Sequence, residues 1–127
     1  MKTIAQQLNI KTFPFYIKDS DGNEIYREWS DGTWSKNEYD ADGKKIYFED
    51  SAGTWSKWEY ADGNEIYYES SNGYWQKREY ADGKEIYFED SNGLIVDNRP
   101  KTDVQKAIDL LTKEGLIVDG KILKTKL

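Results

Sequence analysis

Residues 59–77 read EYADGNEIYYESSNGYWQK, and residues 38–57 read EYDADGKKIYFEDSAGTWSK, which is the same pattern with one additional residue, Asp40. A third copy begins at Glu79, and a looser copy precedes the others around Gly22. Throughout this region the glycines follow one another at intervals of ten residues, with a single interval of eleven. The chain therefore contains an internal repeat of about twenty residues with two turn signals in each copy.

The turn signals and the segments between them predict a meander of strands. Most of the glycines follow Asp or Asn, the pairs that tight hairpin turns favour because a positive φ costs them little. The segments between turns are rich in Ile, Tyr, Phe, Trp and Thr, which favour strands. We expect about nine antiparallel strands, near residues 13–18, 23–29, 33–39, 44–50, 54–60, 64–70, 74–80, 84–90 and 94–98.

The distribution of apolar residues excludes an ordinary two-layer core. All seven leucines and all three valines lie outside residues 19–93, whereas 16 of the 19 aromatic residues lie inside. Side chains alternate across a strand, and each predicted face mixes aromatic with charged residues. In residues 44–50, for example, the alternation puts Lys45 on the face opposite Phe48. We therefore expect an open single-layer sheet stabilised by cross-strand pairs, because a sandwich or barrel needs a continuous apolar face.

The ends of the chain differ from the middle and predict caps for the two sheet edges, which invite aggregation when left open. Residues 1–12 form the N-terminal cap, a short helix that begins at Thr3. Residues 13–98 form the hairpin-repeat sheet. Residues 99–127 form a C-terminal cap of one helix and one hairpin. The sequence thus predicts a single, mainly β domain over residues 1–127.

The C-terminal cap carries its own local signals. Thr102 and Gln105 have the spacing of a capping box, and Gly115 is a typical helix stop. The Asp-Gly pair at 119–120 predicts a two-residue hairpin turn. We expect the apolar side of this helix and hairpin to cover the last strand, 94–98.

The absence of histidine and cysteine excludes several kinds of chemistry. It removes Ser-His-Asp and Cys-His nucleophiles, the usual zinc sites and disulfides, and we expect neither a metal nor another cofactor. Carboxylates such as Glu49 and Glu69 do not make a glycosidase, because a flat, solvated sheet has no cleft that excludes water. We expect no enzyme. The polar N-terminus lacks the apolar segment of a secretory signal or membrane span, so we expect a cytoplasmic protein without membrane contact.

The charge distribution bears on the partner. Residues 19–93 carry a net charge of −11 and the remainder +5. Because an acidic sheet repels phosphate, we expect no direct nucleic-acid binding and infer that the partner is another protein; self-association through sheet edges or faces stays open. The candidate interaction surface consists of aromatic residues and glutamates that recur once per repeat: Trp34, Trp55, Trp75, Tyr47, Tyr67, Tyr87, Glu49, Glu69 and Glu89.

The repeat also resembles known hairpin-repeat sequences. The segment at 39–43, YDADG, followed by Ile46-Tyr47-Phe48, is similar to YD-type (RHS-like) repeats. More closely, the succession of Asp-Gly, Ile-Tyr-aromatic-Glu, Asn-Gly and Tyr-Trp-x-Lys-x-Glu-Tyr resembles the β-hairpin-repeat, single-layer-sheet proteins found among uncharacterised bacterial and phage products. This resemblance implies a fold and no activity.

Three hypotheses about function remain from the sequence. The first is a non-enzymatic scaffold or protein-interaction module. The second is an inhibitor encoded by a phage or mobile element, which binds a basic host protein by imitating the charge of nucleic acid. The third is carbohydrate binding through the column of Trp34, Trp55 and Trp75, since aromatic rings are platforms for sugars as well as structural elements.

Overall fold

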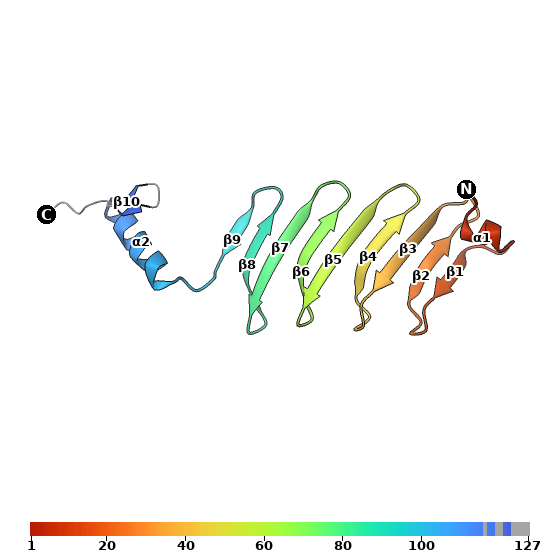
Figure 1. Cartoon of the computed structure of the whole chain (residues 1–127), viewed down its shortest axis with the longest axis horizontal. Helices are drawn as coiled ribbons and strands as arrows, with labels where there is room; N and C mark the ends of the chain where they lie inside the picture. The colour runs from red at the N-terminus through yellow and green to blue at the C-terminus, as the bar shows by residue number, and fades with distance from the viewer. Residues whose placement is uncertain (116, 119–120, 123–127) are drawn as a thin grey trace. The chain divides into compact units, whose positions relative to one another are not determined.

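The structure, a computed structural model, describes residues 1–115, 117–118 and 121–122, and the chain divides into two compact units, Met1–Asp97 and Asn98–Leu127. The first unit is an open nine-stranded sheet in which every strand pairs antiparallel with its neighbours in sequence (Figure 1). Its strands are β1 (Phe15–Lys18), β2 (Glu24–Glu28), β3 (Trp34–Tyr39), β4 (Lys45–Asp50), β5 (Trp55–Ala61), β6 (Asn64–Ser70), β7 (Trp75–Ala81), β8 (Lys84–Asp90) and β9 (Ile95–Asp97). The predicted meander is confirmed, strand by strand.

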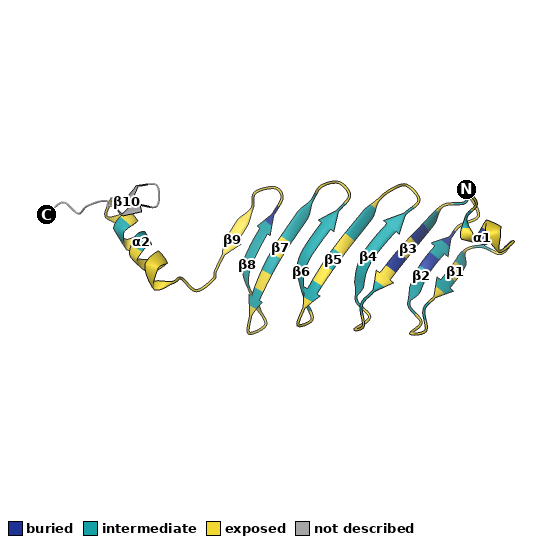
Figure 2. Ribbon diagram, in the orientation of Figure 1, coloured by how far each residue is buried: buried dark blue, intermediate teal, exposed yellow. Residues whose placement is uncertain are grey.

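The sheet forms a single layer, as the sequence predicts. Among the described residues only Ala5 and Tyr26 are buried hydrophobic residues. Most strand residues are half-buried. Apart from Asp90 at the end of β8, the buried strand positions lie on β2 and β3, near the short N-terminal helix α1 (Ile4–Gln7) (Figure 2). The described strands therefore depend on their backbone ladders and on contacts between neighbouring side chains, since almost no apolar residue is removed from water.

Every second hairpin of the meander contains one β-bulge, and the extra residue of that bulge is always isoleucine. In the β5–β6 hairpin, Glu59 pairs with Tyr67 and Tyr60 pairs with Glu65, so Ile66 has no cross-strand partner. The same register shift leaves out Ile25, Ile46 and Ile86 in the other hairpins. A bulge bends its strand and increases the local twist. The column of isoleucines therefore marks the points where these strands bend.

The bulge at Ile46 also changes the face of the sheet on which Lys45 lies. Tyr39 pairs with Lys45 across the bulge at Ile46, which places Lys45 on the same face as Phe48. The Lys45 ammonium lies 5.9 Å from the centre of the Phe48 ring. The prediction that these two residues lie on opposite faces is wrong, because simple alternation does not allow for the extra residue of a bulge.

The turns are of two kinds, and the additional residue Asp40 replaces a two-residue turn by a longer one. Asp62 and Gly63 have φ values of 51° and 81°, as the two-residue type I′ hairpin turn requires. In the turn that contains the additional Asp40, only Gly43 has a positive φ. There the Asp40 carboxylate accepts hydrogen bonds from the backbone N–H groups of Asp42 and Lys44, both at 2.9 Å. The additional residue is thus accommodated in the turn, and the strands keep their register.

The second unit consists of α2 (Asp103–Lys113) and the paired strands β10 (Ile117–Val118) and β11 (Lys121–Ile122). Thr102 caps α2 by accepting a hydrogen bond from the Gln105 N–H at 3.0 Å. The Gln105 side chain donates to Asp109 instead of returning to Thr102, so only half of the predicted capping box forms. The β10–β11 pairing confirms the predicted hairpin, whose turn at 119–120 lies outside the described residues. The covering of the last strand by residues 99–127 stays a prediction.

Deletion of Asp40 tests the interpretation of the turns. Without it, residues 39–43 would match the Tyr-Ala-Asp-Gly sequence of the β5–β6 turn, so we expect a two-residue turn with an unchanged strand register. The free energy of unfolding, measured by urea titration with tryptophan fluorescence, should change by less than about 1 kcal/mol. Deletion of Glu38, inside β3, is the control: it moves the preceding strand residues to the opposite face and should unfold the sheet. Equal destabilisation by both deletions would contradict the interpretation.

Candidate functional site

All nine residues of the predicted interaction surface lie on one face of the sheet. Glu49 pairs with Trp55 and Glu69 pairs with Trp75, so these residues share a face. The others follow from the same registers and from alternation along each strand. We call this surface the repeat face. It comprises the nine predicted residues, Tyr26, Glu28 and the intervening charged residues Lys36, Glu38, Lys57, Glu59, Lys77 and Glu79.

Cross-strand pairing arranges the repeat face in rows that run across the strands. Each residue pairs with the next in the row Glu38, Tyr47, Lys57, Glu69, Trp75. The following row has the same order with a different last residue: Glu59, Tyr67, Lys77, Glu89, Ile95. The first four residues of both rows therefore follow the order acidic, aromatic, basic, acidic, and lysines separate the columns of glutamates.

Each tryptophan of the repeat face carries a lysine on its ring. The ammonium groups of Lys36, Lys57 and Lys77 lie 5.2, 5.0 and 5.1 Å from the ring centres of Trp34, Trp55 and Trp75. These distances are typical of cation–π contacts. The rings are thus partly covered by side chains of the same strand.

A serine from a later turn fixes the backbone of each tryptophan. The Trp55 N–H donates to the Ser71 hydroxyl at 3.1 Å, and the Ser71 N–H donates to the Trp55 carbonyl at 2.9 Å. Trp34 with Ser51 and Trp75 with Ser91 repeat both bonds. The tryptophans therefore stand at regular positions at the end of each ladder.

The tyrosines of the repeat face donate to glutamates two residues along the same strand. The hydroxyl–carboxylate distances are 3.4 Å for Tyr47–Glu49, 2.9 Å for Tyr67–Glu69 and 2.7 Å for Tyr87–Glu89. Burial, together with the Glu69 carboxylate, raises the pKa of Tyr67 above its ordinary value. The Tyr67 hydroxyl therefore keeps its proton at neutral pH and acts as a donor.

The first copy of this tyrosine–glutamate pair is covered by α1. The Glu28 carboxylate accepts hydrogen bonds from the Thr3 hydroxyl at 2.6 Å, the Ala5 N–H at 3.0 Å and the Tyr26 hydroxyl at 2.8 Å. Glu28 is 1% exposed and Ala5 is completely buried. Thr3 and Gln6 form a reciprocal capping box at the start of the helix. The predicted short N-terminal helix is confirmed, and its hydrogen bonds to the sheet fall on Glu28 of β2.

The covering shifts both pKa values of the Tyr26–Glu28 pair. Burial, reinforced by the hydrogen bond to Glu28, raises the pKa of Tyr26 to about 12. Burial by itself would raise the pKa of Glu28, but the donors Thr3, Ala5 and Tyr26 together outweigh it and lower that pKa below its ordinary value. Glu28 is therefore a buried carboxylate that stays ionised at neutral pH.

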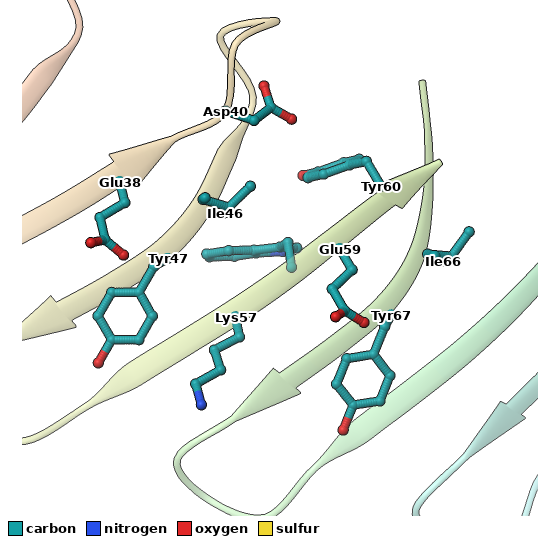
Figure 3. A pocket seen from close by; sticks show the side chains of 10 residues that line it. Glu38, Asp40, Ile46, Tyr47, Lys57, Glu59, Tyr60, Ile66 and Tyr67 are labelled. Atoms are coloured by element: carbon teal, nitrogen blue, oxygen red, sulfur yellow. The ribbon is translucent and has the colours of Figure 1, made fainter. Parts of the chain in front are cut away.

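A groove opens beside the repeat face, where β4 and β5 diverge. Their pairing ends at Tyr47 and Lys57, and beyond it lies a space of about 630 Å³ lined by Ile46, Trp58 and Ile66 among others (Figure 3). Figure 3 also shows Tyr47, Lys57 and Tyr67 pointing the same way from neighbouring strands. The sequence-based prediction missed this groove, since it depends on the bulges.

Trp58 distinguishes this groove from its equivalents elsewhere in the sheet. The corresponding residues of the other repeats are Asn37 and Arg78. The Trp58 ring lies 5.5 Å from the Tyr68 ring, centre to centre. Alignment of the repeats could have singled out Trp58, because it and Trp29 are the two tryptophans outside the regular column.

The comparisons with known proteins leave the family open. No protein-family model matches the chain, and no curated protein matches it. In the described part of the chain, no three His, Cys, Asp or Glu residues are grouped so that they could hold a metal ion. None of the described helices is long and apolar enough to cross a membrane.

Replacement of Glu28 by glutamine tests the polar contact with α1. Since the pKa of Glu28 is lowered on folding, its carboxylate stabilises the fold above about pH 4.5, and this contribution is lost as the pH falls through the folded-state pKa. Glu28→Gln should lower the free energy of unfolding at neutral pH by about 1–3 kcal/mol. Urea titrations should show the difference shrinking below pH 4.5.

Glu69→Gln is the matched control for this prediction, because it changes the same repeat position where the glutamate is half-buried. The control should change the free energy of unfolding by no more than about 0.5 kcal/mol. A Glu28→Gln effect that is equally small, or independent of pH, would contradict the assigned role of the carboxylate.

Proposed function

We propose that the protein is a non-enzymatic scaffold or interaction module that binds another protein through the repeat face. The observation that supports this function is the repetition of one set of side chains, Tyr, Glu, Lys and Trp, in successive rows of an open sheet. Such a surface offers aromatic anchors together with donors and acceptors, as protein interfaces do. The ladder holds the rows at fixed positions, so little order has to be gained on binding.

Carbohydrate binding fits the repeat face less well. A sugar stacks on an open aromatic ring, whereas the rings of Trp34, Trp55 and Trp75 each carry a lysine ammonium. Titration with a panel of glycans should leave the tryptophan fluorescence unchanged. A saturable change that is lost on Trp55→Phe would favour carbohydrate binding instead.

Imitation of nucleic acid also fits less well, because lysines interrupt the acidic columns. Lys36 forms an ion pair with Glu49 at 3.1 Å, and Lys57 and Lys77 occupy the same place in the next rows. A mimic needs an uninterrupted negative surface to occupy a basic groove. The charge of the repeat face is instead partly balanced within each row.

Affinity capture with paired variants tests the proposed function. Glu49→Gln with Glu69→Gln changes the repeat face, and Glu65→Gln with Glu85→Gln removes the same charge from the opposite face. A protein captured from lysate by the parent chain should bind at least about tenfold more weakly to the first variant and unchanged to the second. Circular dichroism should show both variants folded.

Two outcomes of the capture experiment would contradict the proposal. Capture of no protein would argue against an interaction module. Equal weakening by both double variants, with a steep loss of binding as salt is raised, would show that total charge decides the interaction and would favour nucleic-acid mimicry.

A further inference from the structure

The same arrangement of side chains recurs in successive repeats of the sheet, and in the first copy a segment of the chain itself is bound to it. In the first copy, Tyr26 donates to Glu28, Glu28 lies opposite Trp34, and Lys36 covers the Trp34 ring. The start of α1 lies on this set: the Thr3 hydroxyl and the Ala5 N–H both donate to the Glu28 carboxylate. The chain thus shows which kind of segment this arrangement accepts.

The second and third copies have the same construction but are open. Glu49 lies opposite Trp55 and Glu69 opposite Trp75, and the equivalent lysines lie over the rings at nearly equal distances. Tyr47 donates to Glu49 at 3.4 Å, and Tyr67 donates to Glu69 at 2.9 Å. The difference is exposure: Glu28 is 1% exposed, whereas Glu49 and Glu69 are half-buried. The side chains of a binding site are therefore in place without a covering segment.

The open copies differ in how readily their glutamates can accept hydrogen bonds from a partner. Glu49 forms an ion pair with Lys36 at 3.1 Å, which a partner would have to displace or share, while the Glu69 carboxylate accepts a hydrogen bond from the Tyr67 hydroxyl. In the fourth copy Ile95 and Asp97 stand where the others have Trp and Lys. The third copy, around Glu69, therefore has the most favourable site.

The occupied copy also defines what the bound segment must contain. Thr3 supplies a hydroxyl at the helix cap, and Ala5, two residues later, supplies a free N–H and a side chain small enough to be completely buried. The first turn of α1 carries no acidic residue, so nothing repels the carboxylate. Unpaired N–H groups at a helix start favour an acceptor of negative charge.

We propose that the tyrosine–glutamate pairs Tyr67–Glu69 and Tyr47–Glu49 each bind the start of a helix in a partner protein. The partner segment has Ser or Thr at the cap and a small residue two positions later, with no acidic residue in the first turn. The cap hydroxyl and the N–H of the small residue donate to the two oxygens of the glutamate. This inference rests on the proposed function and specifies the chemistry of the partner.

The segment of this chain that meets these requirements is residues 1–12, and it provides the probe. The start of α2 departs from them, because it has the acidic Asp103 after Thr102 and Val104 in the place of Ala5. A synthetic peptide of residues 1–12 would find the Glu28 site filled by the tethered α1, whose effective concentration is high. The peptide is thus directed to the open copies.

The test is an NMR titration of the full-length protein with this peptide. Saturable shifts are expected for the backbone amides around Glu69 and, at higher concentration, Glu49, together with the indole N–H of Trp75 and Trp55. Glu69→Gln should weaken binding at its own site at least about tenfold. Peptides with Thr3→Val or Ala5→Leu are the controls and should bind at least tenfold more weakly, because one removes the hydroxyl and the other blocks the close approach.

Three results would overturn the inference: no shifts at millimolar peptide, equal binding by the Ala5→Leu peptide, or shifts confined to the surroundings of Glu28. Failure here is distinguishable from failure of the proposed function. A captured partner that is lost with Glu49→Gln and Glu69→Gln, combined with no peptide binding, would leave the interaction module standing and exclude helix starts as its ligand. Specific peptide binding without any captured protein would support the helix-start site and argue against the interaction module.

Discussion

The sheet depends on pairs of side chains that lie across neighbouring strands, because both of its faces meet water. Each such pair contributes roughly 0.2–1 kcal/mol, so the fold needs many of them, and the sequence supplies them by repetition. The cross-strand pairs of Lys57 with Glu69 and of Glu69 with Trp75 recur one copy earlier as the pairs of Lys36 with Glu49 and of Glu49 with Trp55. The same side chains therefore stabilise the sheet and form its surface.

The acidity of the sheet has two separate physical origins. Seven of the nine aspartates of residues 19–93 lie between strands, and Asp50 and Asp90 are the last residues of β4 and β8; all ten glutamates of this segment lie within strands. Carboxylates such as those of Asp40 and Asp50 accept backbone N–H groups of their own turns, while the glutamates take part in the cross-strand rows. The net charge of the segment thus follows from turn chemistry and strand pairing, and by itself says little about a partner.

The sequence predicts the strands, the turns and the common face of the nine candidate residues, because each of these follows from local spacing. It misplaces Lys45, since a period of two does not allow for the bulge at Ile46. It also overlooks the groove beside Trp58, which is lined by the bulge residues Ile46 and Ile66. The burial of Glu28 could not be predicted, because it results from a contact with Thr3, 25 residues away in sequence. Local patterns thus determine the repeat, and long-range contacts distinguish its copies.

The buried and the open copies together explain how an exposed aromatic face can be selective. Glu28 is buried with three donors on its carboxylate, whereas water can supply the donors for Glu69 in the open copy. An apolar surface that covered Glu69 would remove that water and leave the carboxylate with the hydrogen bond from Tyr67 but without its water donors, which costs about 1–3 kcal/mol. The glutamates therefore oppose non-specific association of the aromatic rows, and they favour a partner that brings its own N–H and O–H donors to the carboxylate.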